Sequence, residues 1–225
     1  MKFLKSKFIF IMLFGIFLIF ISQVYYISKN FKIDTNSYVS MINGTGFLIS
    51  GGEKKALLEN SKNILNSGDE IYTNNNSVAL ILWGDKSVTR LAQNSRILIK
   101  ENFIGEDLSL INIKFDLLKG KTWSTVVSIF SGNSYFKQEI NGNVAAVRGT
   151  TFEASYDYDY IKVIDHEVKI ENKDKKVVNI SSGEVFSLNS FSLENIRESL
   201  DIAWENLNKN LDKNHFNQIQ EELIN

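Results

Sequence analysis

A histidine among carboxylates, between residues 157 and 167, is the stretch whose residue types could support acid–base catalysis. His166 lies within Ile164-Asp-His-Glu167, and an imidazole oriented by a carboxylate can act as a general base. Short apolar-alternating runs flank this tetrapeptide on both sides, which is typical of a hairpin turn. We therefore expect His166 to be an exposed turn residue, and we predict that the chain has no catalytic residue and is not an enzyme.

The acidic residues of the same stretch could alternatively bind calcium, which prefers oxygen ligands. They are Asp157, Asp159, Asp165 and Glu167. The EF-hand pattern D-x-[DN]-x-[DN]-G is absent, and Gly51-Gly52 is not followed by the G-K-[ST] of a phosphate-binding loop. We predict no metal site and no cofactor.

Three tyrosines alternate with these acids and form a candidate recognition surface. Tyr156, Tyr158 and Tyr160 are two residues apart, so on a β-strand they would share one face. Such a face could stack on a sugar or a peptide, or it could pack against neighbouring strands in the ordinary way.

Arg148 stands in the middle of the apolar, β-prone stretch Asn143-Val-Ala-Ala-Val-Arg-Gly-Thr-Thr-Phe-Glu-Ala-Ser155. In an unbroken strand it would be buried among apolar neighbours, at considerable cost unless it were paired. A bulge at Gly149 would shift the parity, turn Arg148 outward and place inside the residues Ala145, Val147, Phe152 and Ala154. Gly149, Thr150 and Phe152 are thus predicted to be a structural motif, with Arg148 as a candidate recognition residue.

The elements that position these residues are predicted to be β-strands. From about residue 47 to 188, short alternating runs are separated by turn signals such as Asn66-Ser-Gly-Asp69 and Asn141-Gly-Asn143. This pattern predicts a mainly β fold with one all-β domain over 47–188, built as a short β-solenoid, a barrel or a sandwich.

Residues 1–28 predict an uncleaved signal anchor that forms a transmembrane helix. Residues 8–28 contain no charged side chain, and at about 1.5 Å per residue they would cross a hydrocarbon core of about 30 Å. The lysines before this segment favour a cytoplasmic N-terminus, and no small-residue cleavage site follows it. We expect a single-pass membrane protein with residues 29–46 as a tether and an extracytoplasmic domain, either periplasmic or at the cell surface.

Residues 189–225 change to a helical period and are predicted to form an amphipathic helical segment that starts near Ser192. Its apolar positions are Ile196, Leu200, Ala203, Trp204, Leu207 and Leu211. This stripe could pack against the β-domain, or it could bind a partner helix, including association of copies of the chain through residues 192–211.

Composition excludes several classes of function. The net charge is -1, with 25 basic and 26 acidic residues among 225, so we expect no nucleic-acid partner. The absence of cysteine removes disulfides, thiolate zinc sites and a cysteine nucleophile, and two histidines cannot form a multi-histidine metal site.

A series of short motifs resembles the FecR domain family in content and order. They are Leu65-Asn-Ser-Gly-Asp-Glu-Ile-Tyr-Thr73, Ser77-Val-Ala-Leu-Ile-Leu82, Asp85-Lys-Ser-Val-Thr-Arg-Leu91, Asn94-Ser-Arg-Ile97, Leu117-Leu-Lys-Gly-Lys121, Ala146-Val-Arg-Gly-Thr-Thr-Phe152 and Ser182-Gly-Glu-Val-Phe186. The resemblance covers roughly residues 55 to 188. It departs from the family at Lys86, where an Asp-Gly-Ser turn is common.

The resemblance implies an extracytoplasmic β-domain, and the best-known relatives pass a signal from an outer-membrane transporter to a cytoplasmic sigma factor. Only seven residues precede the apolar segment, so we do not expect that full activity here. We predict a non-catalytic, membrane-anchored binding or scaffolding protein that acts through protein contacts in the cell envelope. The alternatives are a transmembrane signalling regulator related to FecR anti-sigma regulators and a glycan-acting envelope enzyme.

Overall fold

The protein divides into two units, Met1–Asp34 and Thr35–Asn225. The computed structural model describes residues 12–23, 25, 34–105, 108–127, 132–194 and 201–224. In the first unit residues 12–23 and 25 are helical, and the predicted membrane segment 8–28 lies partly outside the described residues. Within those residues, no helix has both the length and the apolar character needed to cross a membrane.

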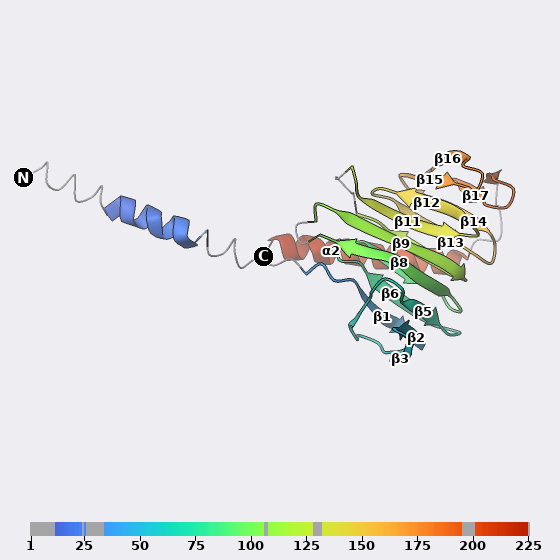
Figure 1. Cartoon of the computed structure of the whole chain (residues 1–225), viewed down its shortest axis with the longest axis horizontal. Helices are drawn as coiled ribbons and strands as arrows, with labels where there is room; N and C mark the ends of the chain where they lie inside the picture. Colours follow the sequence, from blue (N-terminus) through green and yellow to red (C-terminus); the bar gives the residue numbers. More distant parts are fainter. Residues whose placement is uncertain are drawn as a thin grey trace, which may run out of the picture. The chain divides into compact units, whose positions relative to one another are not determined.

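The second unit contains two nine-stranded β-sheets in its described part, which we call sheets A and B (Figure 1). Sheet A has the order β18 (Ser192–Glu194), β17 (Val185–Ser187), β14 (Tyr160–Asp165), β13 (Thr151–Ser155), β10 (Lys121–Thr125), β7 (Val88–Leu91), β6 (Val78–Leu82), β1 (Tyr38–Asn43) and β4 (Asn63–Ile64). Sheet B has the order β16 (Val177–Ser181), β15 (Glu167–Glu171), β12 (Asn143–Val147), β11 (Tyr135–Ile140), β9 (Ile111–Lys119), β8 (Arg96–Ile104), β5 (Glu70–Thr73), β2 (Gly46–Ser50) and β3 (Glu53–Leu57).

The chain passes from one sheet to the other after one or two strands. The hairpins β6–β7, β13–β14 and β17–β18 belong to sheet A, and the hairpins β8–β9, β11–β12 and β15–β16 belong to sheet B. Strand β10 lies in sheet A between two hairpins of sheet B, so β9 and β11 are left as parallel neighbours. The two open sheets correspond to the sandwich among the predicted all-β forms.

An aromatic cluster fills the space between the two sheets. Trp83, which follows β6 of sheet A, has its ring centroid 5.6 Å from Phe115 on β9 and 5.9 Å from Phe136 on β11. All three side chains are fully buried. The indole Nε1 of Trp83 donates a hydrogen bond to Thr89 Oγ1 at 2.9 Å, so this interior satisfies its buried donor.

The β-domain extends beyond the predicted limits of 47–188 at both ends. Strand β1 begins at Tyr38 within the predicted tether, where it pairs with β6. At the other end, Ser192–Glu194 forms β18, which pairs with β17 at the edge of sheet A. The predicted helix start near Ser192 is therefore wrong, because this segment makes ladder hydrogen bonds instead.

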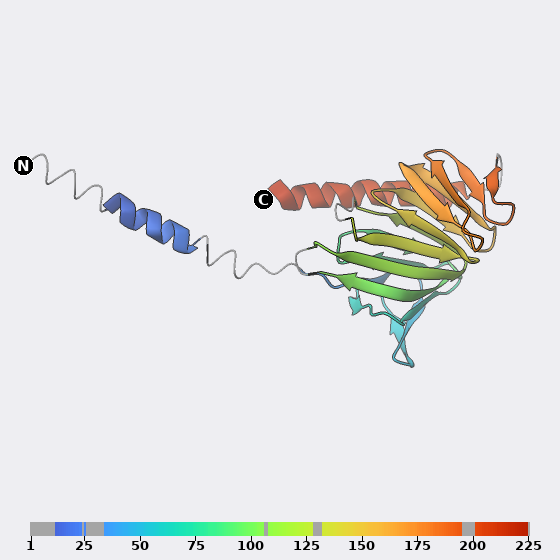
Figure 2. The same ribbon diagram turned by 45° about the horizontal axis from the view of Figure 1, so that its top comes forward.

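The C-terminal helix α2 (Ile202–Ile224) begins after Asp201, whose Oδ1 accepts the backbone N–H of Trp204 at 3.0 Å. This is the usual cap of a helix N-terminus, because it satisfies one of the unpaired donors. The helix runs along the outer face of sheet A (Figure 2). Residues 195–200, with the predicted stripe positions Ile196 and Leu200, lie outside the described residues, and association through 192–211 stays a prediction.

Candidate functional site

The interface between α2 and sheet A is organised around the carboxylate of Asp212. Its Oδ1 lies 2.6 Å from Arg90 Nη1 on β7. Its Oδ2 accepts hydrogen bonds from Trp123 Nε1 at 2.9 Å and from Thr125 Oγ1 at 3.0 Å, both on β10. Arg90 is only 3% exposed and Trp123 is fully buried, so α2 contacts the sheet through a buried ion pair with both oxygens hydrogen-bonded.

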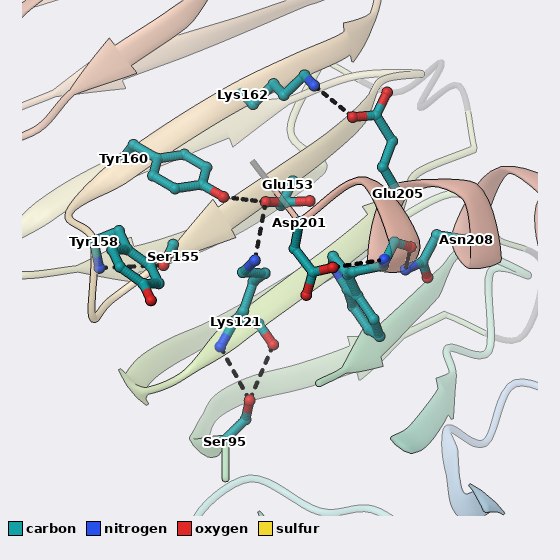
Figure 3. Close-up of polar contacts among 11 residues, drawn as sticks. Ser95, Lys121, Glu153, Ser155, Tyr158, Tyr160, Lys162, Asp201, Glu205 and Asn208 are labelled. Atoms are coloured by element: carbon teal, nitrogen blue, oxygen red, sulfur yellow. Dashed lines mark hydrogen bonds and ion pairs between the residues drawn. The ribbon is translucent and has the colours of Figure 1, made fainter. Parts of the chain in front are cut away.

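A second group of polar contacts lies beside the start of α2 (Figure 3). The hydroxyl of Tyr160 donates to Glu153, and Lys121 Nζ lies 3.7 Å from the same carboxylate. Burial raises the pKa of Glu153, and the charge of Lys121 opposes this effect. Burial, together with the charge of Glu153, raises the pKa of Tyr160.

An ion pair between the first turn of α2 and β14 extends this group. Lys162 Nζ lies 2.6 Å from Glu205 Oε2, and Lys209 of the helix lies 2.6 Å from Oε1. Burial works to raise the pKa of Glu205, but the hydrogen bonds from the two lysines outweigh it and the pKa is lowered. The carboxylates of this interface are thus held by neighbouring cations and hydroxyls, which suits attachment of the helix better than acid–base chemistry.

The outer face of sheet B, in contrast, is open and contains a groove. Two adjoining depressions of about 410 Å³ each share Tyr135, Lys137, Ala146 and Lys169. The other residues around the groove are Glu101, Lys114, Ser134, Phe136, Val144, Val147, Arg148, Glu167, Glu171 and Lys175. Because Ala146 contributes only a methyl group, the middle of this face lies lower than its flanks.

Strand pairing places one lysine on each side of Ala146. Lys137 of β11 is directly opposite Ala146 of β12, and Ala146 is directly opposite Lys169 of β15. The ammonium of Lys137 lies 4.4 Å from the ring centroid of Tyr135. The Tyr135 hydroxyl donates to Glu101, and this hydrogen bond raises the pKa of Tyr135 to about 12. The groove therefore has a cationic centre and a tyrosine that stays protonated.

Of the predicted recognition residues, the structure brings Arg148 to the groove and leaves the tyrosines elsewhere. Arg148 is exposed at the edge of the first depression. Tyr156 and Tyr158 belong to the turn 156–159, and Tyr160 is buried in β14. The expectation of one tyrosine-bearing strand face is wrong, because the chain turns at 156–159, where Asp159 has a φ of 56°.

The stretch around Gly149 connects the two sheets. Strand β12 of sheet B ends at Val147, and β13 of sheet A begins at Thr151. Gly149 has a φ of 62°, a left-handed conformation that favours glycine. Thr150 Oγ1 donates to the backbone carbonyl of Glu167 at 2.8 Å, and Phe152 is fully buried. The expected bulge within one strand is thus replaced by a crossing between sheets, with Arg148 still directed outward.

His166 lies in the turn between β14 and β15, at a φ of 62°. Its Nδ1 is 3.0 Å from Asp165 Oδ2, and both side chains are 67% exposed. The described residues contain no group of three or more histidine, cysteine or acidic residues that could hold a metal ion. The sequence prediction that His166 is an exposed turn residue is confirmed. The expected hairpin is wrong, because β14 belongs to sheet A and β15 to sheet B, and the two strands do not pair.

Sequence reasoning did not identify Lys137 and Lys169, because their significance depends on which strands are neighbours. The signal available in the sequence was the alternation of charged and apolar residues in the runs that became β11 and β15. That alternation predicts one exposed face for each strand. It does not show that the two exposed faces flank the same alanine.

These observations define a two-sheet β-domain in which a helix covers one outer face and the other outer face contains a groove. The chain matches the family model described as FecR protein over residues 69–186, which is more than half of its 225 residues. The chain therefore belongs to the FecR family, and the resemblance inferred from its motifs is confirmed.

Two crystal structures of a protein described as a candidate anti-sigma factor from Parabacteroides distasonis are similar to this chain. Each has a TM-score of 0.44 and 14% sequence identity, and each match covers 56% of this chain. The chain spans 57% of the length of that protein. No curated protein matches the chain.

Proposed function

We propose that this protein is a non-catalytic regulator or scaffold of the cell envelope, which binds a protein partner through its FecR domain. The observation on which this rests is the FecR match over 69–186, in a domain whose sheet B leaves a grooved, charged face uncovered. Sheet A offers no comparable free face over its central strands, because α2 covers them. Sheet B is therefore the surface that we expect a partner to contact.

Residues 8–28 supply the membrane attachment in this proposal, and the domain lies outside the cytoplasm. The support is the uncharged, mostly apolar sequence of this segment and the lysines that precede it. A protease added to intact cells, or to cells with a permeabilised outer layer, should remove the β-domain and leave a membrane-bound N-terminal fragment. A domain that stays protected until the cell membrane is lysed would contradict the proposed topology.

The binding role is tested by photo-crosslinking in intact cells. A photoreactive residue at position 137, on sheet B, should give a discrete crosslinked band, and mass spectrometry should identify the protein in it. Lys55 on β3 provides a control position, because it is exposed and does not line the groove. Absence of any specific crosslink from several positions on the domain would argue against a protein-binding role.

Family membership favours a second candidate, a signalling regulator that passes the binding event across the membrane. In that case, the crosslinked complexes should contain a second membrane protein or a sigma-factor-binding protein. Recovery of copies of this chain alone would favour the scaffold.

A further inference from the structure

We propose that the groove on sheet B binds an extended, acidic segment of the partner protein, with one carboxylate held over Ala146 between Lys137 and Lys169. This inference rests on the proposed function, since it specifies the chemistry of the protein partner. It is carried by three observations: the strand register, the charges that remain unpaired, and the shape of the groove.

The register provides two cations at opposite sides of a small residue. Lys137 and Lys169 lie directly across from Ala146 on the two neighbouring strands, and directly opposite side chains in antiparallel pairs are separated by about 5 Å at Cβ. Long side chains on both sides of a methyl group leave room for an atom group between them. A carboxylate placed there would be within reach of both ammonium groups.

The acids at the groove are largely engaged with groups of the protein itself. Glu101 accepts the hydroxyl of Tyr135, and Glu171 lies 2.7 Å from Lys175 Nζ. Within the part of the chain that the structure describes, no ion pair with a carboxylate is formed by Lys137, Arg148 or Lys169. Five basic residues line the groove, Lys114, Lys137, Arg148, Lys169 and Lys175, against three acids, Glu101, Glu167 and Glu171. The lining of the groove therefore has a net positive charge, which complements an acidic ligand.

The shape of the groove favours an extended chain. The two depressions adjoin along β11 and β12 and share their central residues, so a ligand can follow the face over several residues. A sugar would be expected to stack on an aromatic ring. The ring of Tyr135, however, lies under the ammonium of Lys137, and this arrangement favours a peptide over a glycan.

The proposal is tested by peptide binding to the full chain in a nonionic detergent. The probes are hexaglutamate and hexaglutamine, with dextran sulfate as a polyanionic glycan. We expect hexaglutamate to bind, hexaglutamine not to bind, and the affinity for hexaglutamate to fall as salt is raised. Tighter binding of dextran sulfate than of hexaglutamate at equal charge would overturn the choice of a peptide.

Paired variants assign the binding to the groove. The double change Lys137→Gln and Lys169→Gln should weaken hexaglutamate binding about tenfold, equivalent to about 1.4 kcal/mol. The double change Lys55→Gln and Lys119→Gln removes the same charge outside the groove and should leave the affinity unchanged. Equal losses for the two pairs would show that hexaglutamate responds only to overall charge, and would overturn the proposal.

A third variant, Ala146→Glu, places a carboxylate of the chain itself between the two lysines. It should abolish hexaglutamate binding while the far-ultraviolet circular dichroism spectrum and the melting temperature stay close to those of the wild type. Retained binding by a folded Ala146→Glu protein would overturn the position of the carboxylate site.

The in-cell crosslinks separate failure of this inference from failure of the proposed function. A protein captured from position 55 but not from position 137 would leave a binding protein whose contact surface lies elsewhere, and the groove proposal would be wrong. Loss of crosslinks from every tested position would instead count against the proposed function itself.

Discussion

The two sheets have equal numbers of strands in the described residues, yet their outer faces have opposite environments. In sheet B, the central strands β9, β11 and β12 alternate between buried and partly exposed residues. In sheet A, the central strands β7, β10 and β13 are buried at nearly every position. The difference is caused by α2, which covers one face and leaves the other open.

The covered face is nevertheless polar. Arg90, Trp123 and Glu153 are aligned across three neighbouring strands, and each meets a charged or hydroxyl group. Burial of an ion pair contributes little net stability, whereas removal of one partner leaves a buried charge and is costly. Helix and sheet are therefore joined by hydrogen bonds and ion pairs, in addition to the buried Trp204 of α2.

The largest loss of stability is expected from the change Asp212→Ala, at the interface of α2 and sheet A. It would leave Arg90 buried without its partner and remove acceptors from Trp123 and Thr125. We expect the free energy of unfolding to fall by about 3 kcal/mol. Urea unfolding monitored by tryptophan fluorescence measures this, because Trp123 and Trp204 lie at the α2 interface and Trp83 lies between the sheets.

The matched change in sheet B is Glu139→Ala, which removes the ion pair of Glu139 with Lys114 at 3.4 Å. Both side chains are about one-third exposed, so we expect a loss of about 0.5 kcal/mol. Similar losses for the two variants would show that α2 does not exclude water from Asp212.

In the crossing between the sheets, substitution of Gly149 should lower stability, and substitution of Arg148 should have little effect. Gly149→Val forces a β-branched residue into a left-handed conformation, and we expect the free energy of unfolding to fall by about 2 kcal/mol. Arg148→Ala removes an exposed side chain and should change stability by less than about 0.5 kcal/mol. Thermal unfolding of both variants tests this, and equal small shifts would contradict a conformational role for Gly149.

The hairpin turns of the two sheets differ in the residue type that adopts a left-handed conformation. Between β11 and β12 in sheet B, Asn141 and Gly142 have φ angles of 49° and 75°, and Asn-Gly suits such a turn. Between β6 and β7 in sheet A, Lys86 has a φ of 73°. This is the position at which the family commonly has glycine.

Lys86→Gly should therefore stabilise the protein by roughly 0.5 to 1 kcal/mol. Glycine removes the strain of a left-handed lysine, and this gain exceeds the additional backbone entropy that glycine loses on folding. Gly142→Ala is the opposite change in sheet B and should lower stability by about 1 kcal/mol. Chemical denaturation curves compare the two, and destabilisation by Lys86→Gly would show that the lysine side chain has a role of its own.

The smallest expected difference concerns the dependence of stability on pH. Burial raises the pKa of Glu153 above 4.5, so the folded protein retains this proton to a higher pH than the unfolded chain does. The wild type should therefore lose stability relative to Glu153→Gln as the pH rises above about 4.5.

In sheet B, the hydrogen bond from Lys175 lowers the pKa of Glu171. The Glu171 carboxylate therefore stabilises the folded state at pH values above its unfolded pKa, and this stabilisation is lost as the pH falls. The wild type should lose stability relative to Glu171→Gln as the pH is lowered. Urea midpoints should rise relative to Glu171→Gln from about pH 3 to pH 5, and should fall relative to Glu153→Gln above about pH 4.5, so the two differences have slopes of opposite sign. Slopes of the same sign would contradict the difference in environment.

Much of the β-fold could be predicted from the sequence, because turns and alternation are local properties. Asn141-Gly142 marked a hairpin that the structure contains. Ile164 to Glu167 marked a turn, but this turn connects β14 of sheet A to β15 of sheet B and closes no hairpin. The interpretation failed at Tyr156 and Tyr158, where alternation with acids matched a strand but the chain forms a turn. A period of two is therefore insufficient where turn-forming residues also occur.

The α2 interface could not be predicted from an apolar stripe. Ile202 is 69% exposed and Leu207 is 40% exposed, whereas Asn208 is fully buried and Asp212 nearly so. The burial of these polar positions follows from the polar partners on sheet A, which no pattern within the helix reveals. The groove on sheet B could not be predicted from the sequence for a related reason, because only the strand register places Lys137 and Lys169 beside Ala146.

From β6 onward, strands are added to both sheets in the order of the sequence. Each hairpin therefore contacts mainly the segments made shortly before and after it, as in repeat proteins, where stability is a sum over neighbours. Such a path allows folding to spread from one hairpin to the next without closing long loops. It also means that the domain could lengthen or shorten by whole hairpins, one in each sheet, while the pairing of the remaining strands is preserved.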